Sequence, residues 1–192
     1  MQYSSNSQKI LSQYSERAIS HTFNNDLDMF YLQMLLMLTL NLQPWQAIND
    51  GVMGGISSGR MVAGSEGLRF EGELSLENNG GFASVRRLVT EDLAGMTRVR
   101  LQVRGDGREY QFRIRQDGGF DGVAWRHVFS TSENWQTVDL QFEDFKPVFR
   151  GRPVPQAGPV DASRIRQIGF LIADKTPGAF SLEIRAIEFV GD

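Results

Sequence analysis

The chain of 192 residues contains no cysteine and only two histidines, His21 and His127. The absence of cysteine excludes disulfides, thiolate nucleophiles and cysteine-ligated zinc or iron–sulfur sites. Two histidines are also too few for a multi-histidine metal centre. The composition therefore predicts that the protein holds no metal centre of these kinds.

Long hydrophobic runs are equally scarce, and the one dense run is residues 29–40, MFYLQMLLMLTL. A membrane-spanning helix needs about 20 apolar residues, so this run is too short. A signal peptide would carry basic residues before such a run and small residues after it. Here Asp26 and Asp28 precede the run and LNLQPW follows it. We expect a cytoplasmic protein with no membrane span.

The sequence also lacks a strong excess of charge of either sign, because its formal net charge is −3. A balance this close to neutral does not indicate a nucleic-acid partner. Of the 20 basic residues, 17 are arginine. Arginine suits planar contacts with carboxylates and aromatic rings, although genomic base composition produces the same bias.

What the sequence does contain is alternation of apolar and polar residues from Leu36 onward. In LRFEGELSL, Leu68, Phe70 and Leu74 point one way and the charged residues point the other. The same period recurs in RVRLQVR, EYQFRIR, WQTVDLQF, IGFLIAD and FSLEIRAIEFV, with turn sequences such as RGDGR and DKTPG between them. Alternation predicts strands with one buried face, and many short strands predict an all-β sandwich or barrel.

Three segments depart from this pattern. The alternation slips by one near Ala186, which predicts a β-bulge in the last strand. Residues 146–164 hold four of the six prolines and are expected to form an ordered surface loop with extended segments. Residues 1–35 are expected to form an N-terminal extension, helical near 5–20 or mobile, so that residues 36–192 make a single β domain.

The segment NDGVMGGISSGR, residues 49–60, carries four glycines. It lacks the lysine of a phosphate-binding P-loop and the spacing of a dinucleotide-binding fingerprint. We interpret it as a shaped loop in which Gly51, Gly54 and Gly55 supply positive φ or close backbone approach. ENNGG similarly predicts a turn between two strands, with Gly80 as a second candidate for positive φ.

No catalytic arrangement is evident. Ser57 and Ser58 lie in the glycine-rich loop, and nothing in the sequence brings His127 to them. Alternation places His127 on the same face of a strand as Trp125 and Phe129, which is typical of a structural histidine. The 23 acidic residues are scattered, so no pair of carboxylates can be selected for glycoside hydrolysis. We expect a protein that is not an enzyme.

Four stretches together carry a resemblance to a known family. They are WQAINDGVMGGISSG (45–59), FEGELSLENNGGFASVR (70–86), FKPVFRGR (145–152) and IGFLIADKTPGAFSLEI (168–184). In this order they are similar to the signatures of the complex I intermediate-associated protein 30 family, across roughly residues 43–190.

The resemblance implies a two-sheet jelly-roll β-sandwich of the galactose-binding-like type. It also implies a chaperone-like assembly role for the respiratory NADH dehydrogenase. Some relatives join this domain to a nucleotide-binding domain, which is not present here, so no cofactor is expected. No transit peptide is evident in the sequence, which agrees with the expectation of a cytoplasmic protein.

Two functional hypotheses follow. In the first, the chain is a non-catalytic protein-binding module, and its partners are proteins such as respiratory-chain assembly intermediates. Outward arginines of two strands would form an arginine-rich face for acidic or aromatic groups, unless they pair with acids across strands. These arginines are Arg98, Arg100 and Arg104 on one strand and Arg113 and Arg115 on another.

The recognition edge of this module is predicted in two loops. Asn49, Asp50 and Ser57 lie in the first loop, and Phe149, Arg150 and Arg152 lie in the second. We expect the loops to be neighbours, with Arg150 or Arg152 bonded to Asp50 or to loop carbonyls. The competing interpretation is that both loops only close the sandwich.

In the second hypothesis the chain binds a small ligand or a carbohydrate, an inference from fold analogy alone. Sugar sites use aromatic platforms, for which Trp45, Trp125 and Trp135 are available, although each is more often a core residue. The local candidate site is QDGGFDGVAW, with Asp117, Asp121 and Trp125 close in sequence. Its spacing does not match a known calcium loop, so no metal is predicted.

Overall fold

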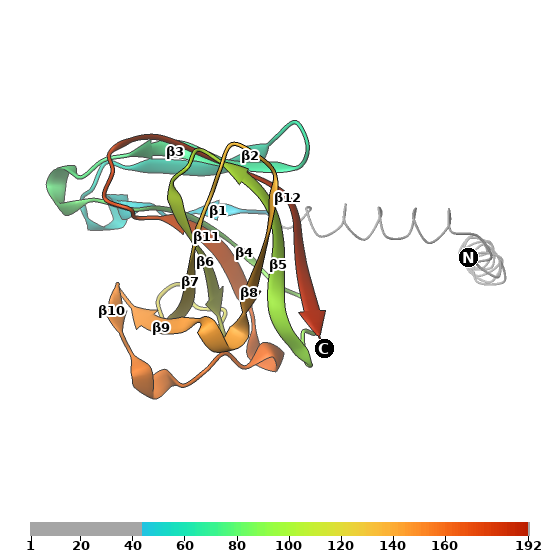
Figure 1. Ribbon diagram of the computed structural model, residues 1–192. Coiled ribbons are helices and arrows are strands. Elements are labelled where there is room, and N and C mark those ends of the chain that lie inside the picture. The colour runs from blue at the N-terminus through green and yellow to red at the C-terminus, as the bar shows by residue number, and fades with distance from the viewer. Residues whose placement is uncertain (1–43, 192) are drawn as a thin grey trace, which may run out of the picture. The chain divides into compact units, whose positions relative to one another are not determined.

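The computed structural model describes residues 44–191, which form two antiparallel sheets packed face to face (Figure 1). The seven-stranded sheet has the order β1-β4-β11-β6-β7-β9-β10, and the five-stranded sheet has the order β2-β3-β12-β5-β8. The prediction of an all-β, two-sheet jelly-roll sandwich is therefore confirmed.

The strands of the seven-stranded sheet are β1 (Gln46–Ala47), β4 (Ala83–Leu88), β6 (Glu109–Arg115), β7 (Ala124–Ser130), β9 (Lys146–Phe149), β10 (Arg152–Pro153) and β11 (Gln167–Ile172). Those of the five-stranded sheet are β2 (Ser58–Ala63), β3 (Leu68–Leu74), β5 (Met96–Gly105), β8 (Gln136–Gln141) and β12 (Gly178–Gly191). Five short 3-10 turns are the helices of the described part: η1 (Asp50–Met53), η2 (Glu77–Asn79), η3 (Phe142–Asp144), η4 (Pro155–Ala157) and η5 (Ala162–Arg164).

The core lies between the two sheets and is built from the inward residues of the alternating strands. Phe112 and Phe170 of the seven-stranded sheet meet with ring centroids 5.3 Å apart, and both are fully buried. Phe70 and Phe180 of the five-stranded sheet meet at 4.9 Å. Each such side chain contributes about 2 kcal/mol by leaving water, so the alternation itself determines how the sheets face each other.

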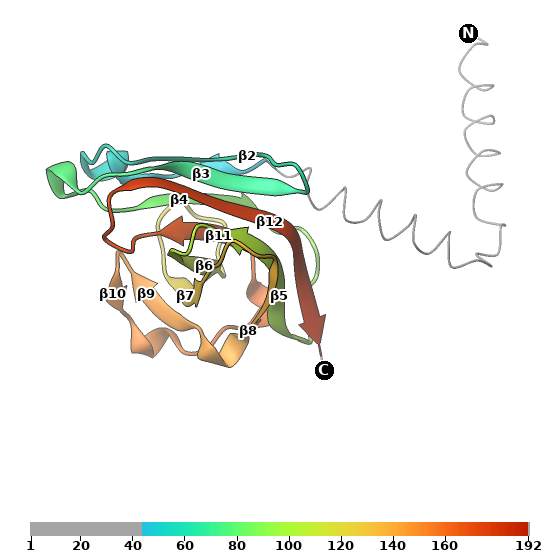
Figure 2. The ribbon, with the colours of Figure 1, turned by 45° about the horizontal axis from the view of Figure 1, so that its top comes forward.

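The last strand contains the predicted bulge. The register of β12 against β5 shifts between Ile184 and Ala186, at the point where the alternation slips. β12 pairs with both β3 and β5, and it bends along its length (Figure 2). The bulge lets one long strand change direction without losing either neighbour.

The proline-rich segment 146–164 contains the β9–β10 hairpin and the turns η4 and η5. Phe149 pairs with Arg152, which leaves Arg150 and Gly151 as a two-residue turn. Both turn residues have positive φ, 47° for Arg150 and 79° for Gly151. This is the conformation of a type I′ hairpin turn.

Residues 1–43 lie outside the described residues. The helix expected near 5–20, the strand expected from Leu36 and the domain boundary between 35 and 36 stay predictions. Within residues 44–191, no helix is long and apolar enough to cross a membrane.

Candidate functional site

Asp50 organises the glycine-rich loop from inside. Its side chain is fully buried, and its carboxylate accepts hydrogen bonds from the Ser57 amide (2.9 Å) and the Ser57 hydroxyl (2.5 Å). It also accepts from the amides of Gly81 (2.7 Å) and Phe82 (3.2 Å). Burial opposes ionisation, but the hydrogen bonds from Ser57, Gly81 and Phe82 outweigh it and lower the pKa of Asp50. The carboxylate therefore stays charged and ties two loops together.

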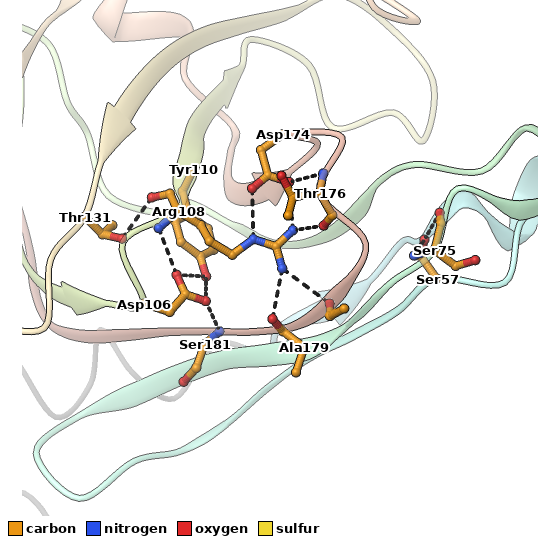
Figure 3. Close-up of polar contacts among 11 residues, drawn as sticks. Ser57, Ser75, Asp106, Arg108, Tyr110, Thr131, Asp174, Thr176, Ala179 and Ser181 are labelled. Atoms are coloured by element: carbon orange, nitrogen blue, oxygen red, sulfur yellow. Dashed lines mark hydrogen bonds and ion pairs between the residues drawn. The ribbon is translucent and has the colours of Figure 1, made fainter.

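Asn49 and Ser57 serve the same purpose. Asn49 accepts from the Ser84 amide at 3.1 Å and donates to the Gly59 carbonyl at 3.2 Å. The Ser57 hydroxyl and the Ser75 backbone exchange hydrogen bonds at 3.0 Å (Figure 3). These predicted recognition residues thus point into the protein and anchor the loop.

The prediction of positive φ or close backbone approach is confirmed for Gly54, whose φ is 92°, and for Gly55, which lies close to the Asp50 side chain. It is wrong for Gly51, which has neither property. Positive φ at Gly80 is also wrong, because the second loop has positive φ at Asn78, Asn79 and Gly81 instead. A Cβ on Gly55 would lie 2.4 Å from Cγ of Asp50, and one on Gly80 would lie 2.6 Å from its Oδ2. Both positions need glycine because the buried carboxylate approaches the backbone.

The tip of the anchored loop is apolar and exposed. The exposed fractions are 62% for Val52, 60% for Met53 and 55% for Ile56. Leu76, in the neighbouring loop that Asp50 holds, is 45% exposed. We call these four residues the apolar tip. Exposed large side chains on a rigid loop are a common property of protein-binding sites.

The predicted contact between the two recognition loops is not formed. Arg150 donates to Asp121 at 2.5 Å and lies over the ring of Phe149, 5.2 Å from its centroid. Arg152 is exposed on β10. Asp50 follows β1, and its partners Gly81 and Phe82 directly precede β4. The strand β10 is the opposite edge of the seven-stranded sheet. The prediction was wrong because sequence spacing does not reveal the order of strands.

The alternative site is not assembled either. Trp125 points into the core with 5% exposure and donates from its indole nitrogen to the Gly158 carbonyl at 2.9 Å. Asp117 turns back on its own loop and accepts from the Gly119 amide at 2.9 Å. Since Asp121 pairs with Arg150, the three residues do not converge on one ligand.

The predicted arginine-rich face is divided between the two sheets. Arg98, Arg100 and Arg104 belong to β5, and Arg113 and Arg115 belong to β6, so they cannot form one surface. Arg100 pairs with Asp139 at 2.8 Å, and Arg104 pairs with Glu183. For Arg100 and Arg104, the alternative interpretation is therefore correct: these arginines pair with acidic residues on neighbouring strands.

Besides the hydrogen-bonded cluster around Asp50, the structure contains a second polar hub, centred on Arg108 and Asp174, which the sequence did not predict. Arg108 binds Asp174 with two hydrogen bonds of 2.8 and 2.7 Å, and its remaining donors reach the carbonyls of Thr176, Gly178 and Ala179 (Figure 3). The guanidinium holds the pKa of Asp174 below its ordinary value. This hub joins the start of β6 to the segment leading into β12, and so links the two sheets. Its sequence signals were the turn sequences RGDGR and DKTPG, which hold Arg108 and Asp174.

The three tryptophans do not offer open platforms. Trp45 packs on Phe170 at 5.9 Å, with the guanidinium of Arg87 5.7 Å from its centroid. Trp135 is covered by the guanidinium groups of Arg104 and Arg185, at 4.9 and 4.1 Å. The remaining tryptophan is the buried Trp125. His127 packs edge-on against Phe145 at 5.3 Å, as a structural histidine does.

Metal ligation finds no support in the described part of the chain. Among residues 44–191, no three His, Asp or Glu side chains are grouped closely enough to hold an ion.

The fold defines the class of protein first. The sandwich is similar to the family 11 carbohydrate-binding module of the cellulase Lic26A-Cel5E of Clostridium thermocellum, with a TM-score of 0.60 and 20% identity. That match covers 79% of this chain and 89% of the module. At this identity the likeness shows a shared galactose-binding-like jelly roll and nothing about the ligand.

Within that class, the chain belongs to the complex I intermediate-associated protein 30 family, whose model matches residues 37–184. It is 34% identical over 110 residues to the mitochondrial protein of that name from Mus musculus, covering 55% of this chain and 33% of the relative. The Drosophila melanogaster protein is 29% identical over 116 residues, covering 56% and 38%. The chain thus spans about a third of the length of these curated relatives. Both names specify mitochondria, so the cytoplasmic location stays a prediction.

Proposed function

We propose that the chain is a non-catalytic protein-binding module that takes part in assembling a respiratory complex of the complex I type. Family membership supports the role, and the relatives' names connect them with complex I intermediates. The observation that carries the proposal is the apolar tip, where Val52, Met53 and Ile56 are each more than half exposed.

The tip is suited to a transient partner because it is pre-organised. The buried carboxylate of Asp50 and its four hydrogen bonds hold the loop before any partner arrives. Binding then costs little loop ordering, so the apolar contact area contributes directly to affinity. An assembly intermediate exposes apolar surface that its finished complex buries, and such a surface is the matching partner for the tip.

The test is affinity purification of the tagged protein from its own host. The variant Val52→Ser/Met53→Ser/Ile56→Ser should lose captured respiratory-chain subunits while its melting temperature stays that of the wild type. Leu88→Ser is the matched control, because Leu88 is 53% exposed outside the tip, and it should capture normally. Normal capture by the triple variant would contradict the proposal, as would a wild type that recovers no respiratory subunits.

We retain Phe149, Arg150 and Arg152 as a proposed second contact. Phe149 is 38% exposed and Arg152 lies beside it across the hairpin. Arg152→Glu should weaken capture with unchanged thermal stability, and unchanged capture would remove this edge from the binding surface.

Carbohydrate binding is the second candidate function, since Phe120 is a 65% exposed aromatic ring in the β6–β7 loop. The guanidinium of Arg86 lies over one face of this ring, 4.9 Å from its centroid. Stacking of a sugar on the opposite face is the mode that the fold likeness suggests. Binding on a glycan array that Phe120→Ala abolishes would favour it over the assembly role.

A further inference from the structure

The outer face of the seven-stranded sheet carries a row of cations. Arg86 of β4, Gly169 of β11, Arg113 of β6 and Arg126 of β7 are successive cross-strand partners. Arg115 lies on the same face, two residues beyond Arg113. Neighbouring strands are about 4.8 Å apart, so the four arginines share a strip about 15 Å wide. We call Arg86, Arg113, Arg115 and Arg126 the arginine row.

Gly169 separates Arg86 from Arg113 within the row. A Cβ at this position would lie 2.5 Å from the Val85 carbonyl oxygen and 3.1 Å from Cβ of Arg86, so β4 approaches β11 closely here and only glycine fits. Gly169 adds no side chain between the two arginines, which therefore share one face of the sheet.

The charge of the row is not neutralised by ion pairs. Arg86 donates to the Phe120 carbonyl at 3.0 Å, and Arg115 donates to the Gly122 carbonyl at 2.9 Å. Arg113 donates to the Gln111 amide oxygen at 3.2 and 2.9 Å. These acceptors are all neutral.

Within residues 44–191, no carboxylate lies at salt-bridge distance from any member of the row. Other arginines do pair with carboxylates, among them Arg60, Arg69, Arg100, Arg104, Arg108, Arg150 and Arg185. Asp117 acts on Arg86 and Arg115, and Asp121 acts on Arg115, in each case from beyond salt-bridge distance. Half-buried guanidinium groups without a carboxylate partner destabilise the folded protein, and a bound anion would offset that loss of stability.

Electrostatics agrees with the geometry. Burial, together with the charges of Arg115 and Arg126, lowers the pKa of Arg113 to about 10. Burial and the charge of Arg115 likewise lower the pKa of Arg86. The members of the row thus repel one another, and a bound anion would relieve that repulsion.

We propose that the arginine row binds the phosphate group of a phosphate monoester. A single carboxylate carries one charge and two acceptor atoms, so it would leave most of the row unpaired. A phosphate monoester carries close to two negative charges at pH 7 and three acceptor oxygens, which suit several guanidinium forks at once. This site is independent of the apolar tip and does not depend on the proposed assembly role.

The test is calorimetric titration of the full chain with glycerol 2-phosphate and with a phosphoserine peptide. Glycerol, the unphosphorylated peptide, sulfate and citrate are the matched probes. We expect binding of the phosphate esters alone, and at least a tenfold rise in Kd for Arg113→Gln and Arg126→Gln. Arg100→Gln on the other sheet, which removes a paired arginine, should bind as the wild type does.

Stability separates a binding role from a structural one. Arg113→Gln removes an unpaired cation, so its melting temperature should equal or exceed that of the wild type without ligand. Tighter binding of the peptide would assign a protein-borne phosphate, and equal binding would assign a soluble ester. Equal affinity for sulfate or citrate, absence of phosphate binding, or an unchanged Kd in Arg113→Gln would overturn the proposal.

Discussion

Asp50 shows how one residue can determine the shape of a recognition loop without touching a partner. A buried carboxylate is costly unless its oxygens are satisfied, and here four hydrogen bonds satisfy them. Three of the donors are backbone amides of two separate loops. Asp50 therefore replaces backbone pairing in a region where the strands have ended.

We predict that Asp50→Ala destabilises the protein by about 3 kcal/mol, because it leaves buried amides of Ser57, Gly81 and Phe82 without acceptors. Asp50→Asn should cost less, since its one carbonyl oxygen still accepts. Chemical denaturation measures both. The control is Asp139→Asn at a half-exposed carboxylate, and a cost for Asp50→Ala no larger than for this control would contradict the hub.

The same residue predicts a dependence of stability on pH. The folded-state pKa of Asp50 lies below its ordinary value of 3.8, as does that of Asp174. Their contributions are therefore fully present above the ordinary value and are lost as pH falls through the lower, folded-state values. Denaturation curves should show stability falling below about pH 4. The fall should be shallower in Asp50→Asn, and an identical slope would count against the lowered pKa.

At the scale of elements, two glycines of the end loops, Gly55 and Gly80, are required for close approach and not for an unusual dihedral angle. We predict that Gly55→Ala and Gly80→Ala each cost about 2 kcal/mol, because the new methyl group would overlap the Asp50 carboxylate. Gly51→Ala is the control, since nothing lies within 4 Å of its Cβ position. Equal melting temperatures for all three variants would contradict this prediction, because they would show that the loop accommodates the added methyl group without loss of stability.

The β9–β10 turn gives a second prediction at this scale. Arg150 has a φ of 47°, a conformation that asparagine adopts more readily than arginine. Its ion pair with Asp121 joins two well-exposed side chains and contributes little. Arg150→Asn should therefore keep or raise the melting temperature. A marked fall would mean that the ion pair matters more for folding than the turn.

For the whole molecule, the contacts that join the sheets decide stability. Arg108 and Asp174 are nearly buried, with side-chain exposures of 12% and 10%, and they link β6 to the segment before β12. We predict that Arg108→Met costs about 3 kcal/mol, because it leaves Asp174 as an unpaired buried charge. The exposed Arg60→Met is the control and should change stability by less than about 0.5 kcal/mol. Similar melting temperatures for the two variants would show that the Arg108–Asp174 pair does not stabilise the fold.

Much of the fold could be predicted from local pattern. Alternation assigned the strands around Phe70, Phe112 and Phe170 because side-chain direction reverses at every residue of a strand. The slip at Ala186 predicted the bulge for the same reason. The shaped loop at residues 49–60 could also be predicted, because its residue types and spacing are local properties.

The site depended on information that no local pattern holds. The sequence alone determined that this chain is an all-β sandwich of a recognisable family, because the faces of the strands and the order of the motifs depend only on positions along the chain. Only the tertiary structure decided that Arg150 meets Asp121 and not Asp50, and that Arg113 stands beside Arg86 and Arg126 without a carboxylate. Those neighbours depend on strand order, and strand order follows from how two whole sheets bury their apolar faces together.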